Sequence, residues 1–380
     1  MLSQRMTGEL RCPLCSFCAP PTVVPLPCPE CTIPIGYRRD LPLDLLPSDL
    51  TGEGVWRYAP LLPDVEPVAL GEGDTPLVSS VRIGPQLGVD LWFKVEGANP
   101  SGSFKDRGAS VMVSVLQSFG AKAVTDDSSG NAGAALAAYA ARAGLRAVLY
   151  VPAHASGPKL SQISALGADV VRVPGPRERA ADAVREACRT DSILLYASHN
   201  ASPYFVSGIT TLAYELFEGL GERPPDHVVV PVGGGGLFLG VVYGFLRLRG
   251  LGWIEHIPQV HIVQPAACSP IVYARAAGGV APFEREPSST IAEGARIPNP
   301  PRGREIVAML KAVGGEAVAV GEEEILNAQR LLAHAEGLYV EPTSALPAAA
   351  LAQLVARGTI CEMSTVAMVL TGTGLKTVPS

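Results

Sequence analysis

One lysine, Lys105, occupies a segment whose composition favours a reactive amine. The segment, residues 99–108, reads NPSGSFKDRG: a turn rich in serine and glycine precedes the lysine, and an Asp-Arg pair follows it at the expected start of a helix. A lysine in a loop is ordinarily a solvated charge, so the rest of the chain has to supply a reason for chemistry. An amine held in this way can form a Schiff base with a carbonyl compound and can exchange protons.

Three further segments place small or polar residues where an apolar run ends. The first, SSGN, leads into an alanine-rich stretch, where it could be a plain N-cap or an anion site at the helix N-terminus. The second is a run of four glycines, whose entropic cost indicates close approach of the backbone to a ligand or tight packing. The third ends in a threonine hydroxyl. The residues concerned are Ser128, Ser129, Gly130, Asn131, Gly233, Gly234, Gly235, Gly236 and Thr371.

A phosphate-bearing cofactor accounts for these segments better than a nucleotide does. The glycine run does not satisfy the G-x-G-x-x-G fingerprint, and the next apolar run ends in Gln264 rather than in an acidic residue. The Walker motif G-x-x-x-x-G-K-[ST] is absent from the sequence. Pyridoxal 5'-phosphate uses every feature: an amine for its aldehyde, a glycine backbone for its phosphate and polar side chains for its ring.

The elements that must position these residues alternate between short apolar runs and alanine-rich stretches that end in glycine. Continuous Val/Ile/Leu runs indicate strands buried on both faces, so the pattern predicts an α/β fold with doubly wound parallel sheets. Ligands bind such sheets beyond the carboxyl ends of the strands. The expected strands are 89–95, 123–127, 146–151, 169–173, 193–198, 227–232, 259–264, 317–320 and 365–370. The expected helices are 105–119, 131–143, 158–166, 177–189, 209–219, 236–249, 322–336 and 344–356.

Length and composition predict an enzyme with a large core. The 380 residues suggest two main domains, and 47% hydrophobic against 17% charged residues excludes a disordered chain. The net charge is −6 and the sequence has no long basic run, so its charge pattern does not indicate binding to nucleic acid or to an anionic membrane. The sequence shows neither a signal core nor an apolar run of about 18 residues, so a cytoplasmic location is expected.

Five of the eight cysteines fall within residues 12–31, where CPLC and CPEC form two C-x-x-C pairs. This spacing is typical of a tetrahedral zinc site, and a short module with little core of its own needs such a metal to fold. Four thiolates leave no open position, so the Zn2+ is expected to be structural. Cys18 is an additional thiol without an expected role. The expected ligands are Cys12, Cys15, Cys28 and Cys31.

These segments together resemble the threonine synthase branch of the β-family, or fold type II, pyridoxal-phosphate enzymes. The resemblance runs from about residue 56 to residue 376. It is carried by WRYAPLLP (56–63), LGEGDTPL (70–77), NPSGSFKDRG (99–108), DDSSGNAGAALAAYAARAG (126–144), VGGGGL (232–237), TIAEGARIPNP (290–300), YVEPTSA (339–345) and LTGTGLK (370–376).

The resemblance implies a role for each of these positions. Lys105 would be the catalytic residue and would hold the cofactor through a Schiff base, with Phe104 beside it. Asn131 would bind the 3′-oxygen of the cofactor and Thr371 its ring nitrogen. The phosphate would be bound by the backbone of Gly233, Gly234, Gly235, Gly236 and Leu237. The substrate carboxylate would be bound by Ser128, Ser129, Gly130 and Ala132.

The reaction implied is the conversion of O-phosphohomoserine and water into threonine and phosphate, a lyase step of amino-acid biosynthesis. The chain departs from the family at Ala132, where threonine is usual, and at Phe205, where an arginine helps hold the substrate phosphate. The polar residues Lys159, His199, Asn200 and Ser202 could replace these contacts. Serine or threonine dehydration, ammonia elimination from diaminopropionate and β-replacement in the manner of cysteate synthase therefore stay open, as does a non-catalytic binding protein of the same fold.

Composition and the resemblance together predict how the chain is organised. The Cys- and Pro-rich residues 1–40 would form a zinc-ribbon-like module, and residues 41–72, punctuated by Pro, Leu and Gly, a linker. A large cofactor-binding domain would comprise 73–104 and 206–380, and a smaller, mobile domain would comprise 105–205. The partners expected are an amino-acid substrate and a second copy of the chain in a homodimer, with no nucleic acid and no membrane.

Overall fold

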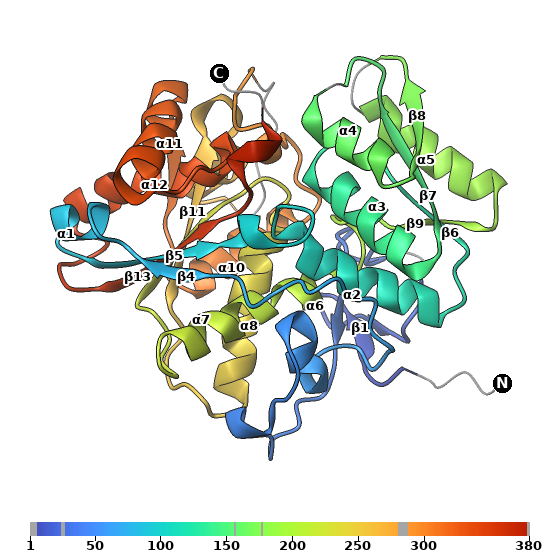
Figure 1. The fold of residues 1–380 in the computed structure, drawn as a ribbon. Helices are drawn as coiled ribbons and strands as arrows, with labels where there is room; N and C mark the ends of the chain where they lie inside the picture. The colour runs from blue at the N-terminus through green and yellow to red at the C-terminus, as the bar shows by residue number, and fades with distance from the viewer. Residues whose placement is uncertain (1–5, 24–26, 156, 176–177, 280–287, 378–380) are drawn as a thin grey trace. The chain divides into compact units, whose positions relative to one another are not determined.

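The chain divides into two compact units in the computed structural model (Figure 1). The structure describes residues 6–23, 27–155, 157–175, 178–279 and 288–377. The first unit comprises Met1–Gly73, Asn99–Ile209 and Lys376–Ser380, and the second comprises Asp74–Ala98 and Thr210–Leu375. Residue 177 of an expected helix, and parts of the expected N-terminal module and large domain, lie outside the described residues. Among those described, no helix has the length and apolar character needed to cross a membrane.

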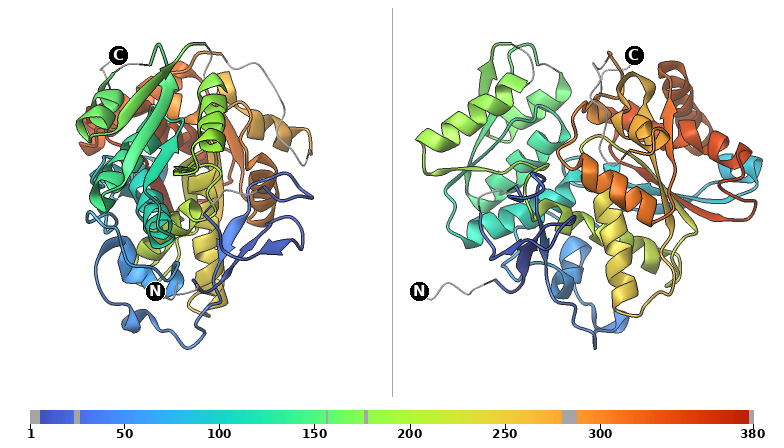
Figure 2. Two further views of the ribbon diagram at one scale, coloured as in Figure 1. Left: turned by 90° about the vertical axis from the view of Figure 1, so that its right-hand side faces the viewer. Right: turned by 180° about the vertical axis from the view of Figure 1, so that it is seen from behind.

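The first unit is built on a four-stranded parallel sheet in the order β8-β7-β6-β9. The chain moves outward from β6 to β8 and then returns to add β9 beside β6, so right-handed connections place helices on both faces (Figure 2). The strands are β6 (Ala123–Asp126), β7 (Arg146–Pro152), β8 (Asp169–Val173) and β9 (Leu194–Tyr196). The helices are α2 (Lys105–Ser118), α3 (Asn131–Ala143), α4 (Pro158–Ala165), α5 (Glu178–Thr190) and α6 (Phe205–Ile209).

Helices α2 and α3 pack side by side in this unit (Figure 1). Alanine favours the helix and keeps α3 slender, so its buried face can pack closely. The helix ends at Gly144, which adopts the left-handed conformation that glycine tolerates. α2 is buried almost throughout, from Asp106 to Leu116, and so belongs to the core of the unit.

The second unit is built on a six-stranded sheet in the order β12-β11-β10-β13-β5-β4. All pairs are parallel except β4 with β5. The strands are β4 (Leu77–Ser79), β5 (Asp90–Val95), β10 (His227–Pro231), β11 (Gln259–Pro265), β12 (Ala317–Val320) and β13 (Thr365–Leu370). The helices are α1 (Ile83–Leu87), α7 (Thr211–Gly219), α8 (Gly236–Gly250), α9 (Pro270–Ala276), α10 (Gly303–Ala312), α11 (Glu322–Glu336) and α12 (Pro342–Ala356).

The predicted α/β fold with parallel sheets is confirmed, and each expected strand is present. Three features differ from the expectation. The expected helix 209–219 is α7, and the short helix α6 before it was not predicted. Helices α1, α9 and α10 were not predicted. The sheet of the second unit also gains an antiparallel edge strand, β4, whose three residues carry too little apolar pattern to be read from sequence.

The N-terminal residues form a small antiparallel sheet in the order β2-β1-β3. Its strands are β1 (Glu9–Arg11), β2 (Cys18–Ala19) and β3 (Gly36–Arg38). Leu10 and Tyr37, which face each other across β1 and β3, are both buried. So little apolar surface is available that this module needs a further source of stability.

Two buried histidines bridge β10 and β11 in the second unit. Nδ1 of His227 lies 3.0 Å from Nε2 of His261, and the backbone N–H of Glu316 donates to Nδ1 of His261 at 3.1 Å. Nδ1 of His261 therefore carries no proton, and its Nε2–H donates to His227. Burial lowers the pKa of both rings, that of His261 to about 4. Protonation of either ring would break one of these hydrogen bonds.

We expect this pair to make stability depend on pH. A histidine in the unfolded chain titrates near 6.5 and His261 titrates near 4 in the folded one, so the stability that its neutral form contributes is lost as the pH falls between these values. H261N should lower the free energy of unfolding by roughly 1–3 kcal/mol at pH 7, and this difference should shrink toward pH 4. Denaturant titrations at several pH values measure this difference, with H154N, at an exposed position, as the control. A difference in the free energy of unfolding between wild type and H261N that stays constant with pH would contradict the expectation.

Candidate active site

Lys105 is the first residue of α2 and is half-buried, and its amine lies near two aromatic rings. Its Nζ is 4.6 Å from the ring centroid of Phe104 and 5.5 Å from that of Phe205. Phe205 is the first residue of α6 and is buried. The Phe104 ring thus lies beside the amine, and Phe205, expected only as a departure from the family, lies near it as a second aromatic ring.

A buried carboxylate ties the turn before Lys105 to the first turn of α2. Asp106 accepts a hydrogen bond from the backbone N–H of Ser101 at 2.6 Å and another from its hydroxyl. Burial raises the pKa of Asp106 to about 7, and the hydrogen bonds from Ser101 and the charge of Lys376 oppose that rise. The Nζ of Lys376 and the side chain of Gln162 both donate to the Ser101 carbonyl, at 2.6 and 3.1 Å. This turn is therefore held from several sides.

The neighbouring residues Glu72 and Tyr139 extend this buried polar group. The Tyr139 hydroxyl donates to the Glu72 carboxylate at 2.9 Å, and the backbone N–H of Leu70 donates to the same oxygen at 2.8 Å. Burial raises the pKa of Tyr139, so its hydroxyl keeps the proton that it donates. The LGEGDTPL segment is thereby attached to α3, beside which α2 and Lys105 lie.

The SSGN segment forms the loop between β6 and α3, as predicted. Gly133 in the first turn of α3 allows it to approach the loop closely, because a Cβ there would lie 2.0 Å from the carbonyl oxygen of Ser128. The Ser128 hydroxyl accepts a hydrogen bond from the N–H of Gly130 at 3.3 Å. Asn131 and Ala132 open α3, so these residues meet the positive end of the helix dipole.

A histidine and an aspartate lie at the carboxyl ends of the adjacent strands β6 and β9. Nδ1 of His199 is 3.1 Å from a carboxylate oxygen of Asp126, which is buried. The His199 ring packs edge-on against Phe205, with 5.9 Å between centroids. His199 and Lys105 therefore contact the same aromatic ring. His199 was expected only as one of several polar residues that could contact the substrate. Its contact with Asp126 could not be predicted from the sequence.

The glycine run of the second unit connects β10 to α8. Gly235 has a φ of +88° and is the N-cap of α8, with no side-chain cap. A Cβ at Gly233 would lie 2.6 Å from the carbonyl oxygen of Gly294, and one at Gly235 would lie 2.2 Å from the side chain of Ile306. Only glycine fits these two positions, and the first N–H groups of α8 lack partners within the helix. The loop thus has the donors and the narrow backbone that a phosphate requires.

Thr371 lies at the carboxyl end of β13, the strand beside β10. Its hydroxyl is 2.7 Å from that of Ser344, which also accepts a hydrogen bond from the N–H of Gly372 at 2.8 Å. Thr371 and Ser344 are both buried. A linked pair of hydroxyls can donate to or accept from a ring nitrogen without carrying charge.

Thr371 was expected at the site, whereas Ser344, Thr343 and Gly294 were not singled out from the sequence. Thr343 accepts a hydrogen bond from the N–H of Gly294 at 3.1 Å, and Gly294 lies against Gly233. The TIAEGARIPNP segment thus packs against the glycine loop through Gly294, and the YVEPTSA segment holds Gly294 through Thr343. In the sequence, only the family resemblance pointed to these two segments. No local pattern indicates which distant loop a residue will contact.

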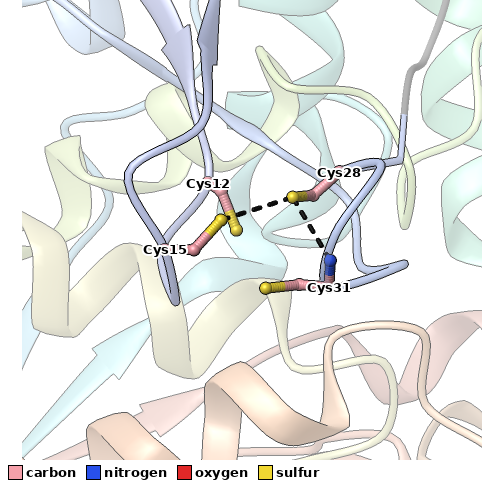
Figure 3. A group of neighbouring side chains, drawn as sticks. All are labelled: Cys12, Cys15, Cys28 and Cys31. Atoms are coloured by element: carbon pink, nitrogen blue, oxygen red, sulfur yellow. Dashed lines mark hydrogen bonds between the residues drawn. The ribbon is translucent and has the colours of Figure 1, made fainter.

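The four cysteines of the N-terminal module converge (Figure 3). Their sulfur atoms all lie within 4.8 Å of one another, and those of Cys15 and Cys28 are 3.5 Å apart. The backbone N–H groups of Leu14 and Cys31 point at the sulfurs of Cys12 and Cys28, each at 3.4 Å. The cluster can hold a metal ion.

Each unit thus brings together its own share of the expected residues. In the first, Lys105 and Phe104 open α2 and residues 128–132 open α3, the helix packed beside it. In the second, the glycine loop and Thr371 follow neighbouring strands. The donor sets fit pyridoxal phosphate: an amine beside aromatic rings, a backbone cradle that a Cβ would fill, and a buried hydroxyl pair. The individual roles of these residues stay predictions.

A family model described as "Pyridoxal-phosphate dependent enzyme" matches residues 68–372. The chain belongs to this family of enzymes, as the sequence predicted. Within it, the chain is 39% identical over 326 residues to the threonine synthase of Methanosarcina acetivorans. The matched region covers 85% of this chain and 80% of the relative. The chain is 37% identical over 330 residues to the threonine synthase of Methanocaldococcus jannaschii, with the same coverage.

Solved structures support the same fold. The T.th. threonine deaminase is 30% identical to this chain and superposes with a TM-score of 0.65, over 80% of this chain and 94% of its own. Maize serine racemase is 25% identical, with a TM-score of 0.68 over 80% of this chain and 90% of its own. The predicted fold type II architecture is confirmed.

We expect the glycine loop to be sensitive to a single methyl group. G235A introduces strain from its left-handed φ and a clash with Ile306, and it should weaken binding of pyridoxal phosphate roughly tenfold or more. Gly252, just after the other end of α8, is a matched control: its φ is +75° and a Cβ there meets nothing within 4 Å. G252A carries the left-handed strain without the clash, so it should lose less stability than G235A and bind the cofactor normally. Equal cofactor affinity in the two variants, measured by fluorescence titration, would exclude a cofactor role for this loop.

Proposed function

We propose that the chain is a threonine synthase-like lyase that converts O-phosphohomoserine and water into threonine and phosphate. The observation that carries the proposal is the placement of Lys105 at the start of α2, near two aromatic rings and on a buried polar support. Similarity to threonine synthases over 85% of the chain supports the choice of reaction.

The chain's own residues divide the work in this proposal. When bound, pyridoxal phosphate joins covalently to an amine and withdraws electrons from the α-carbon of an amino acid. Lys105 would hold the cofactor and, as the amine nearest the reacting carbon, move protons as base and acid. Asn131 and the Thr371 hydroxyl would orient the ring, and the N–H groups of residues 233–237 would bind the phosphate. A hydroxyl does not hold a ring nitrogen protonated, so the proton transfers would depend on Lys105.

Substrate binding is proposed for the loop Ser128, Ser129, Gly130 and Ala132, whose N–H groups and hydroxyls suit a carboxylate. A specific observation favours a second candidate, dehydration of serine or threonine. Phe205 places a buried apolar ring 5.5 Å from the Lys105 amine, at a position where the resemblance expects an arginine for a substrate phosphate. The chain also shares 30% identity with a threonine deaminase.

Substrate profiling separates these candidates. We expect the holoenzyme to release phosphate from O-phosphohomoserine and to form threonine, whereas dehydration would release ammonia and a keto acid from serine or threonine. K105A should lose at least about a thousandfold in kcat, because the covalent link and the proton transfers are both removed. Lys122→Ala, at an exposed position two residues beyond the Gly120 turn, is the control and should keep full activity.

An outcome with ammonia release only would replace the first candidate by the second. Pyridoxal phosphate bound without turnover of any amino acid would support the non-catalytic alternative. Unchanged turnover in K105A would contradict both catalytic candidates.

We further propose that the metal of the cysteine cluster is a structural Zn2+. Tetrahedral zinc with Zn–S bonds of about 2.3 Å places sulfur atoms about 3.8 Å apart, which suits a cluster whose sulfurs lie within 4.8 Å of one another. Backbone N–H groups that point at Cys12 and Cys28 would stabilise thiolates. Cysteines kept reduced for metal binding suit the cytoplasm, which is the location proposed.

Metal analysis of the purified protein should find about one zinc ion per chain. C12S and C28S should lose the zinc and destabilise the module, since a buried ligand is removed from each. Cys18, an exposed thiol outside the cluster, is the matched control, and C18S should keep its zinc. A full zinc content in C12S, or iron in place of zinc in the wild type, would contradict this assignment.

A homodimer is proposed on the strength of the resemblance alone. Light scattering on the purified protein would show twice the chain mass of 39.6 kDa if it is correct.

A further inference from the structure

The cysteine module contacts α6, the short helix that begins with Phe205. The backbone N–H of Tyr37 in β3 donates to the carbonyl oxygen of Pro203 at 3.1 Å. The Tyr204 hydroxyl donates to the carbonyl oxygen of Thr22 at 2.9 Å. The rings of Tyr37 and Tyr204 also contact each other, with 5.6 Å between centroids. Tyr37 and Tyr204 are 4% and 1% exposed, so this contact is buried.

The position of Thr22 in the chain connects this contact to the cysteine cluster. Thr22 lies in the loop that joins the two C-x-x-C pairs, between Cys15 and Cys28. Residues 16–23 of that loop directly follow the first pair, and the N–H of Cys12 donates to the carbonyl of Phe17 at 2.9 Å, so their geometry depends on the cluster. Closure of the cluster around a metal would hold the carbonyl that Tyr204 binds.

Helix α6 packs closely against α2. A Cβ at Gly208 in α6 would lie 2.0 Å from the carbonyl oxygen of Arg107 in α2. A Cβ at Gly108 in α2 would lie 2.7 Å from the ring of Phe205. The backbones of α6 and α2 thus approach each other through glycines on both sides, and a shift of α6 must be followed by a shift of α2.

The chain of contacts ends at Lys105. Phe205 follows Tyr204 directly, and its ring is 5.5 Å from the Lys105 amine. Each step lies within the first unit, from Thr22 through Tyr204 and Phe205 to Lys105.

We infer that the cysteine module is a positioning element for Lys105, acting through Tyr204 and Phe205. The inference rests on the proposed function of Lys105. Metal bound at the four cysteines fixes the Thr22 loop and β3, these hold Tyr204, and Tyr204 fixes the Phe205 ring beside the amine. Loss of the metal then alters the surroundings of Lys105 without touching any atom of the cofactor site. Tyr204 is a positioning residue in this scheme.

The test uses the full-length holoenzyme and two variants that each remove one tyrosine hydroxyl. Y204F removes the bond to Thr22 and keeps the ring. Tyr37→Phe is the matched control, because its hydroxyl binds Thr7 inside the module while its ring and N–H still contact the α6 side. The readouts are the pH titration of the absorbance of the cofactor joined to Lys105, and kcat separately from KM.

We expect Y204F to shift the midpoint of this titration and to lower kcat roughly tenfold or more with a smaller change in KM, because misplacement of a reacting group acts on the chemical step. Removal of the metal with a chelator should shift the titration in the same direction, and added zinc should reverse the shift. Tyr37→Phe should titrate as the wild type does.

Wild-type titration and kcat in folded Y204F and in folded metal-free enzyme would overturn the inference. Circular dichroism shows whether each protein is folded. Should Y204F not fold, F205L takes its place: it keeps an apolar side chain in α6, loses the ring beside the amine and is expected to show the same shift. Failure of the proposed function is distinguishable, because the wild-type holoenzyme would then show no cofactor absorbance that depends on Lys105.

Discussion

The close packing of α2 against α6, with its buried polar support, is the constraint on which the first unit depends. Glycines at 108 and 208 let a backbone and an aromatic ring approach where a Cβ would overlap them. Hydrogen bonds from Ser101 to Asp106 connect the preceding turn to the helix and restrict the conformation of the residues before Lys105. A lysine side chain has many rotamers, and an amine useful in catalysis has to be confined to a few of them. The packing of α2 and the Phe104 and Phe205 rings beside the amine both confine Lys105.

The second unit solves a different problem, which is to present backbone rather than side chains. Its glycine loop is narrow because Gly294 and Ile306 lie where side chains of the loop would be, and α8 supplies N–H groups at its start. Ser344 holds the Thr371 hydroxyl at the end of the neighbouring strand. The donors that the second unit offers in these contacts are hydroxyl and backbone groups. A neutral ring nitrogen and a lysine responsible for the proton transfers suit such surroundings.

Much of the fold could be predicted because its determinants are local. Apolar runs marked every parallel strand of the two large sheets, and alanine-rich stretches marked α3 and α12. Short elements such as β4 and α1 escaped, because three to five residues carry no reliable period. The sequence also suggested the chemistry proposed for Lys105 and the glycine loop, because residue type and neighbouring residues carry that signal. Partners were not: Ser344 beside Thr371, Asp126 beside His199 and Tyr204 beside Thr22 are set by tertiary packing between segments far apart in sequence.

The most direct test of the central claim is chemical. Reduction of the holoenzyme with borohydride makes a Schiff-base link permanent, and peptide mass mapping then locates it. The mass of the reduced cofactor is predicted on the peptide that contains Lys105, in the segment SFKDRG. A label on a different lysine, or none on any peptide of a protein that binds pyridoxal phosphate, would contradict it.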